Sequence, residues 1–311
     1  MHTRTWAPMA LCSLLLCASR ADSAPAAGFR AAPTWVAEDL NLQADAFAAG
    51  PTAFAAATNG ASGATITVYN HAAPSGRRAL ARISSPLLKS LGGIAFASSN
   101  VLLATENGAQ GTAFAISIAS GETVALAPPH SIPNPAQVRV RPTDGAIFVV
   151  SAGNPGEGAI YRVQGGRAIP FATRLGVGYL GGIGFDRAGA LYAADTNDPN
   201  FLGLPGRILG LSPQGISFGA VSLAGGHGTG AYDVAVDRQG ALYATTGSSI
   251  TCVRGGQSFA LGTFIGDYPF PTDIAVDPDG GVIVNGIYTG VGGLFRLHIA
   301  DRATRLRSPL P

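Results

Sequence analysis

The sequence predicts an all-β fold, a six-bladed β-propeller with four antiparallel strands in each blade. One observation behind this prediction is a repeat: AYDVAVDRQGALYATTG (residues 231–247) returns forty residues later as PTDIAVDPDGGVIVNG (271–286). The other is composition, because 43 glycines and 21 prolines are spread along the 311 residues. Such a chain favours many short strands joined by tight turns.

Every copy of the repeat contains an apolar residue, here called the anchor, that opens a short strand and is followed by a turn and a second apolar strand. The turn glycine lies six or seven residues beyond the anchor in four copies, and Asn100 replaces it in a fifth. Glycine and asparagine adopt positive φ most easily, so this exchange supports the alignment. The six anchors are Ala46, Ile94, Val138, Ile183, Val234 and Ile274. Their intervals of 40 to 51 residues match propeller blades, whereas a two-sheet sandwich, the alternative fold, requires no such regularity.

The outer half of each blade is predicted from pairs of alternating apolar runs around a turn, at 158–172, 206–221 and 292–307. In the last pair, residues 302–308 read as an outermost strand. Residues 34–40 would then add to the last blade or cross its edge.

The first 26 residues predict a cleaved signal peptide. His2 and Arg4 precede an apolar run at 7–18 that is too short to span a bilayer, and small residues follow that permit cleavage after Ala21 or Ala26. We therefore expect export, with a periplasmic or secreted protein. Residues 27–43 form an N-terminal segment and candidate ring-closing strand, and 44–311 form the propeller. Cys252 is the only cysteine after residue 26, so no intramolecular disulfide is expected in the exported chain.

Charge and hydropathy restrict the partners. Only 12% of the residues are charged and the formal net charge is +2, without the concentrated basic face that nucleic-acid binding requires. We expect no nucleic-acid partner, no membrane span and a monomer.

The blocks DVAVDRQGALYAT (233–245), GIGFDRAGALYAADTND (182–198) and GRILGLSPQG (206–215) resemble the repeats of NHL-type propellers and of the wider six-bladed group that includes gluconolactonase-like proteins. The resemblance covers about residues 44–307 and implies the six-bladed fold. It also implies that Asp195 and Asn197, with Arg207, brace a blade.

Metal ligands of gluconolactonase-like enzymes sit two residues before several anchors. These positions hold Ala44, Gly92, Ala136, Gly181, Tyr232 and Thr272 here, none of them a carboxylate or an amide. The family's metal site is therefore not carried over. The zinc-binding histidines of peptide-amidating lyases, which share the general shape, are not matched either, because His71, His130, His227 and His298 lack the spacing.

The strand pattern itself points to a different site. In an antiparallel blade, the start of the innermost strand lies beside the end of the second strand, so both open onto one mouth of the central channel. The residues directly before the anchors are Asp45, Gly93, Gln137, Gly182, Asp233 and Asp273. Glu106 ends one of the second strands. We expect Asp45, Glu106, Asp233 and Asp273 to converge, with Arg139 one step deeper because residues two apart on a strand share a face.

Two functions remain open. The first is a binding module whose channel mouth takes a small molecule, a glycan or a protein through Arg139, Asp233, Asp273 and Glu106. The alternative is a lactonase-like hydrolase or lyase in which a divalent cation such as calcium, held by Asp45, Glu106, Asp233 and Asp273, polarises a carbonyl. His227 is a candidate general base, because its loop precedes an innermost strand.

A purely structural role for these aspartates is also open. Asp233 and Asp273 would then accept backbone N–H groups of a neighbouring blade. Three further aspartates precede the turn glycines and are predicted to form turns: Asp186, Asp237 and Asp277.

Overall fold

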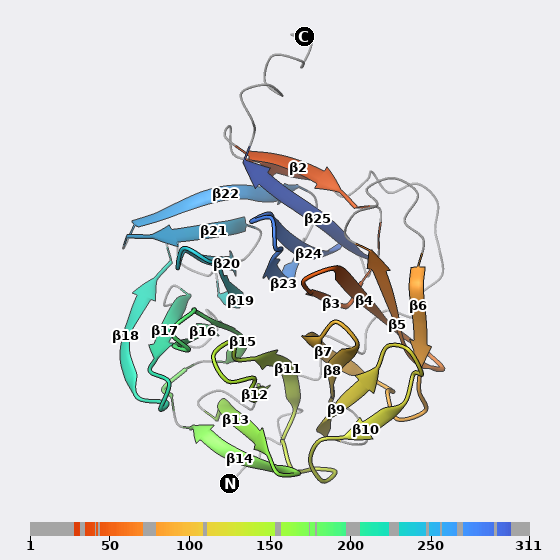
Figure 1. Ribbon diagram of the computed structural model, residues 1–311. Helices are drawn as coiled ribbons and strands as arrows, with labels where there is room; N and C mark the ends of the chain where they lie inside the picture. Colours follow the sequence, from red (N-terminus) through yellow and green to blue (C-terminus); the bar gives the residue numbers. More distant parts are fainter. Residues whose placement is uncertain are drawn as a thin grey trace, which may run out of the picture.

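A computed structural model shows an all-β protein in which six sheets surround a central axis (Figure 1). The structure describes residues 28–31, 35–40, 42, 44–70, 79–107, 111–152, 157–173, 175–177, 179–196, 206–223, 230–246, 249–255, 257–265, 270–288 and 291–299. No helix occurs among these residues, and so none that could span a membrane. The predicted fold class is confirmed.

Each blade runs from an innermost strand outward in chain order. Blade 1 consists of β3 (Ala46–Ala49), β4 (Ala53–Gly60), β5 (Gly63–Asn70) and β6 (Ala79–Ser84). Blade 2 consists of β7 (Leu91–Ser98), β8 (Val101–Glu106), β9 (Thr112–Ser117) and β10 (Thr123–Ala125). Blade 3 consists of β11 (Pro135–Val140), β12 (Ile147–Ser151), β13 (Ala159–Gln164) and β14 (Arg167–Ala172).

The second half of the ring repeats this order and adds the N-terminal strands. Blade 4 consists of β15 (Leu180–Phe185), β16 (Leu191–Asp195), β17 (Arg207–Leu211) and β18 (Ser217–Ser222). Blade 5 consists of β19 (Ala231–Val236), β20 (Leu242–Thr246), β21 (Ser249–Arg254) and β22 (Gln257–Ile265), with β1 (Gly28–Ala31) as a fifth strand. Blade 6 consists of β23 (Phe270–Val276), β24 (Val282–Tyr288), β25 (Val291–Ile299) and, outermost, β2 (Trp35–Asp39).

The ring is closed by the N-terminal segment. β2 runs antiparallel to β25, with Trp35 opposite Ile299 and Asp39 opposite Phe295, so strands from the two ends of the chain share one sheet (Figure 1). The predicted outermost strand at 302–308 lies outside the described residues.

All six anchors lie on innermost strands, as predicted, and none exposes more than 1% of its surface. The apolar core is divided into six clusters, each formed by the facing sides of two neighbouring blades. No blade buries its apolar faces alone, which explains why this sequence forms a closed ring. Cys252 belongs to the cluster between blades 5 and 6.

The turns between first and second strands follow the predicted chemistry in three blades. Oδ1 of Asp186, of Asp237 and of Asp277 accepts the N–H groups of the residues two and four positions later. The following glycines, Gly189, Gly240 and Gly280, have φ of 83°, 83° and 85°. Asn100 differs from the expectation: it does not have positive φ, because the turn of blade 2 is shorter and Ser98 pairs directly with Val101.

Candidate functional site

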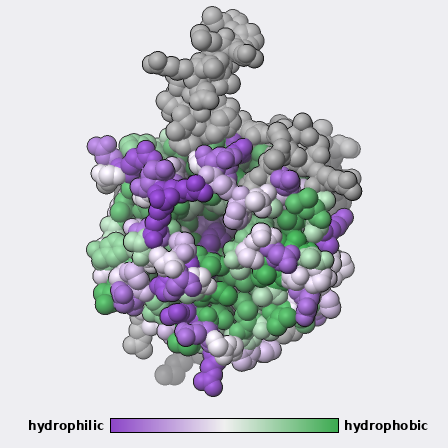
Figure 2. Space-filling view, viewed as in Figure 1, coloured by the Kyte–Doolittle hydropathy of each residue, from purple (hydrophilic) through white to green (hydrophobic). Residues whose placement is uncertain are grey.

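A β-bulge shapes the start of the innermost strand in five blades. The register with the second strand shifts just before the anchor, for example between Pro135 and Gln137 and between Ala231 and Asp233. Such a bulge redirects the next side chain. Figure 2 shows a hollow at the centre of the ring with hydrophilic residues in it.

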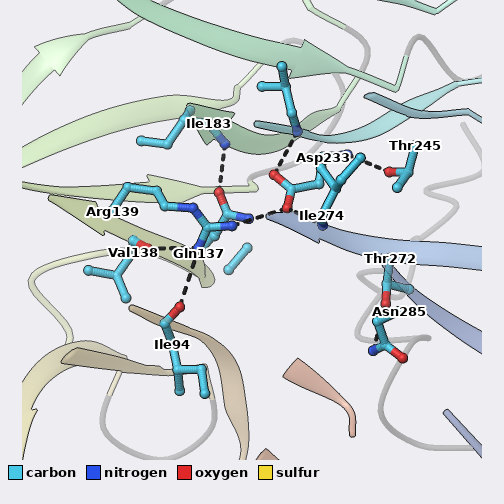
Figure 3. A network of polar contacts seen from close by, with 12 residues as sticks. Ile94, Gln137, Val138, Arg139, Ile183, Asp233, Thr245, Thr272, Ile274 and Asn285 are labelled. Carbon is cyan, nitrogen blue, oxygen red and sulfur yellow. Dashed lines mark hydrogen bonds and ion pairs between the residues drawn. The ribbon is translucent and has the colours of Figure 1, made fainter. Parts of the chain in front are cut away.

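Asp233 is fully buried and bonded on both carboxylate oxygens. Its Oδ1 accepts the N–H of Val234 at 2.8 Å. Its Oδ2 accepts the N–H of Ile274, the anchor of blade 6, at 3.0 Å and an N–H of Arg139 at 3.1 Å (Figure 3). Burial raises the pKa of Asp233, while Arg139 and the Ile274 N–H oppose that rise. The carboxylate therefore links blade 6 to blade 5, which is the structural role considered above.

Arg139 reaches this carboxylate from blade 3. Its Nη1 donates to the carbonyl oxygens of Ile94 at 3.3 Å and Val138 at 3.1 Å, while its Nη2 pairs with Asp233 (Figure 3). The side chain of Arg139 keeps 19% of its surface exposed, whereas that of Asp233 is fully buried. The guanidinium of Arg139 thus pairs with the carboxylate that lies directly before the anchor of blade 5.

Asp273 lies against the seam between blades 6 and 1 and is 8% exposed. Its carboxyl accepts the backbone N–H of Phe47 and a side-chain hydrogen bond from Gln137. Burial, together with the negative charge of Asp233, raises the pKa of Asp273 to about 7, while Arg139 opposes the rise. Because Arg139 pairs directly with Asp233, we expect the first proton taken up by this pair to reside on Asp273.

The other two predicted metal ligands make separate contacts. Asp45 is exposed, and its Oδ2 accepts the N–H of Asn59 at 2.5 Å. Glu106 is fully buried at the end of β8, opposite Leu91 and Thr112. Nowhere in the described part of the chain do three or more His, Cys, Asp or Glu side chains gather as a metal site would require. The donor set proposed for a cation therefore does not assemble there.

The remaining sequence candidates have separate outcomes. His227 and Asn197 lie outside the described residues. Asp195 accepts a hydrogen bond from Nε of Arg207 at 2.8 Å, and Arg207 also donates to the carbonyl of Gly176 at 2.7 Å. This pair connects β16 and β17 of blade 4 with the segment that precedes the blade.

Two residues of the site were not selected from the sequence. Gln137 is buried beside the carboxylates, and its Oε1 accepts the N–H of Ile183 at 2.6 Å (Figure 3). Asn285, opposite Asp273 on β24, donates to the carbonyl of Ala44 at 2.9 Å across the ring-closing seam. Gln137 occupies the ring position directly before an anchor, so the alignment of the repeats could have indicated it. Asn285 lies on β24, the second strand of blade 6, and no feature of the repeat distinguishes it from its neighbours.

Comparisons with known proteins identify solved structures that share the overall fold of this chain. No protein-family model and no curated protein matches the chain. Among solved structures, a gluconolactonase from Xanthomonas campestris superposes with a TM-score of 0.62 at 15% identity, over 90% of this chain and 100% of that one. This chain and that gluconolactonase therefore share the six-bladed β-propeller fold. A calcium-binding regucalcin from Agrobacterium tumefaciens superposes with a TM-score of 0.56 at 17% identity, over 88% of this chain and 94% of that one. At these identities the similarity establishes the fold.

Proposed function

We propose that this protein is a lactonase-like hydrolase of small molecules, with Asp273 as its general base. The observation that carries the proposal is the Asp273 carboxyl, whose pKa is raised to about 7 at the centre of the ring. A group with this pKa accepts and returns a proton near neutral pH, which is the requirement for general acid–base catalysis. The similarity to a gluconolactonase supports this reading better than the binding module favoured by the sequence.

The proposed reaction is hydrolysis of an ester or lactone. Asp273 takes one proton from a water molecule while the water oxygen bonds to the carbonyl carbon. The C–O bond to the leaving oxygen then breaks, and Asp273 returns the proton to that oxygen. Arg139 pairs with Asp233 and acts electrostatically on Asp273, and we assign to it the stabilisation of the developing negative charge.

Calcium was expected from the sequence as a cofactor of the hydrolase, and a regucalcin is among the similar structures. The described residues do not fit it as a ligand set. Both oxygens of Asp233 already accept hydrogen bonds, and Asp45 is bonded to the backbone of Asn59. No step of the proposed reaction is therefore assigned to a cation.

The test is hydrolysis of gluconolactone and of aryl esters by the purified protein, with and without a chelator. Asp273→Asn should lower kcat/KM by about 100-fold or more, because removal of a general base typically costs that much. Asp279→Asn is the matched control, since Asp279 is an 82% exposed aspartate of the same blade. Equal activity of Asp273→Asn and the native protein would contradict the proposal. Absence of turnover in the native protein, with retained ligand binding, would favour the binding module.

A further inference from the structure

The side chain of Gln137 has one orientation that satisfies its neighbours. Its Oε1 accepts the N–H of Ile183, the anchor of blade 4, at 2.6 Å. Since the oxygen and nitrogen of an amide lie on opposite arms, this bond directs Nε2 away from the N–H of Ile183. There Gln137 forms side-chain hydrogen bonds with the carboxyl groups of both Asp233 and Asp273. One amide thus connects groups from blades 3, 4, 5 and 6.

The space for this arrangement is provided by Gly182. A Cβ at that position would overlap Oδ1 of Asp233 and would lie 2.6 Å from Nε2 of Gln137. The amide nitrogen and the carboxylate therefore both pack against the bare backbone of Gly182. Gly182 occupies in blade 4 the ring position that Gln137 and Asp233 occupy in blades 3 and 5.

We propose that Gln137 is a positioning residue, which holds the carboxyl groups of Asp233 and Asp273 side by side while blade 4 fixes its own orientation. The expected effect of Gln137 on the kcat–pH profile rests on the proposed function, whereas its effect on the titration of Asp273 does not. Without the Nε2 donor, the two carboxyl groups would face each other with Arg139 as the remaining side-chain donor to the pair.

The electrostatic surroundings of Asp273 make this role measurable. Among the described residues, the charged groups that act on Asp273 are Asp233 on β19 and Arg139 on β11. Its cross-strand neighbour on β24 is the neutral Asn285, and β3 contributes the backbone N–H of Phe47. A change in the Gln137 donor should therefore appear directly in the titration of Asp273.

The decisive variant is Gln137→Glu. It retains size and an acceptor for the Ile183 N–H but replaces the Nε2 donor with a second oxygen. We expect the midpoint of the rising limb of the kcat–pH profile to move up by about one pH unit or more, because a hydrogen bond to a carboxylate is lost and a like charge is gained. Near pH 6 kcat should fall about tenfold with little change in KM, and at pH 9 it should approach the native value. Gln239→Glu, the same exchange at an exposed turn residue of blade 5, should leave the profile unchanged.

A measurement without turnover separates this inference from the proposed function. Carboxyl carbon NMR titration of Asp273 should show the same upward shift in Gln137→Glu, and also in Gln137→Met, which removes the donor without adding charge. If Gln137→Glu fails to fold, the Asp273 titration in Gln137→Met tests the positioning role. An unchanged Asp273 titration in a folded variant overturns the positioning role. An inactive native protein whose Asp273 titration still shifts would refute the hydrolase and retain the positioning role.

Discussion

Two aspartates at equivalent positions have different roles. The oxygens of Asp233 are bonded to two backbone N–H groups and to Arg139, so this residue joins blades and offsets the charge of the guanidinium. Asp273 has less compensation and a pKa of about 7. The structural reading thus fits Asp233, whereas the proposed function uses Asp273 of the same ring.

At the residue scale, the absence of a side chain on Gly182 predicts a loss of stability on substitution, because Asp233 and Gln137 occupy the space that a Cβ would fill. Gly182→Ala would push its methyl group into Asp233, and overpacking of this kind typically costs about 1–3 kcal/mol. The control is Gly60→Ala, at an exposed glycine whose Cβ would meet its nearest neighbour at 3.3 Å. Urea unfolding should show the loss in Gly182→Ala, with a change below about 0.5 kcal/mol in the control. If Gly182→Ala and the native protein had the same urea midpoint of unfolding, Asp233 would be able to move aside without a loss of stability.

At the element scale, the repeat was enough to locate the innermost strands and the ring of residues before the anchors. Gln137 and Arg139 lie two residues apart on β11, and their register with β12 is continuous because the bulge lies before Gln137. The sequence could not assign the bonding partners in other blades, since these lie 41 or more residues away along the chain, as between Asp233 and Ile274. It also grouped Asp45 with the channel carboxylates, whereas the backbone of Asn59 binds that side chain.

The ring-closing strand gives the prediction at this scale. β2 supplies the outer ladder of blade 6, and several backbone hydrogen bonds worth about 0.5–1.5 kcal/mol each would be lost without it. A chain that begins at residue 40 should therefore unfold at a clearly lower urea concentration than one that begins at residue 33, since both of these chains lack β1 and differ in β2. Coincident unfolding curves would mean that β2 contributes nothing to closure.

At the scale of the whole molecule, six apolar seams hold the ring together, and polar side chains also form hydrogen bonds between neighbouring blades near the axis. Asp233 bonds blade 6, while Asp273 and Asn285 bond blade 1. The seam between blades 6 and 1 therefore contains Asp273, whose pKa is raised to about 7, and the stability of the propeller is linked to the protonation of this proposed catalytic base.

This linkage has a definite sign. The pKa of Asp273 is about 7 in the folded protein against a usual value of 3.8, so between these values the folded state holds a proton that the unfolded state has released. The free energy of unfolding should accordingly fall as the pH rises from 4 to 7, by up to about 4 kcal/mol, and level off above the folded pKa. Other groups also titrate in this range, so the quantity to measure is the difference between the native protein and Asp273→Asn in urea unfolding at several pH values. The variant should lose the slope that belongs to Asp273, and Asp279→Asn should keep it. Parallel curves for the native protein and Asp273→Asn would mean that Asp273 is ionised throughout, and the same result would remove the basis for its role as a general base near pH 7.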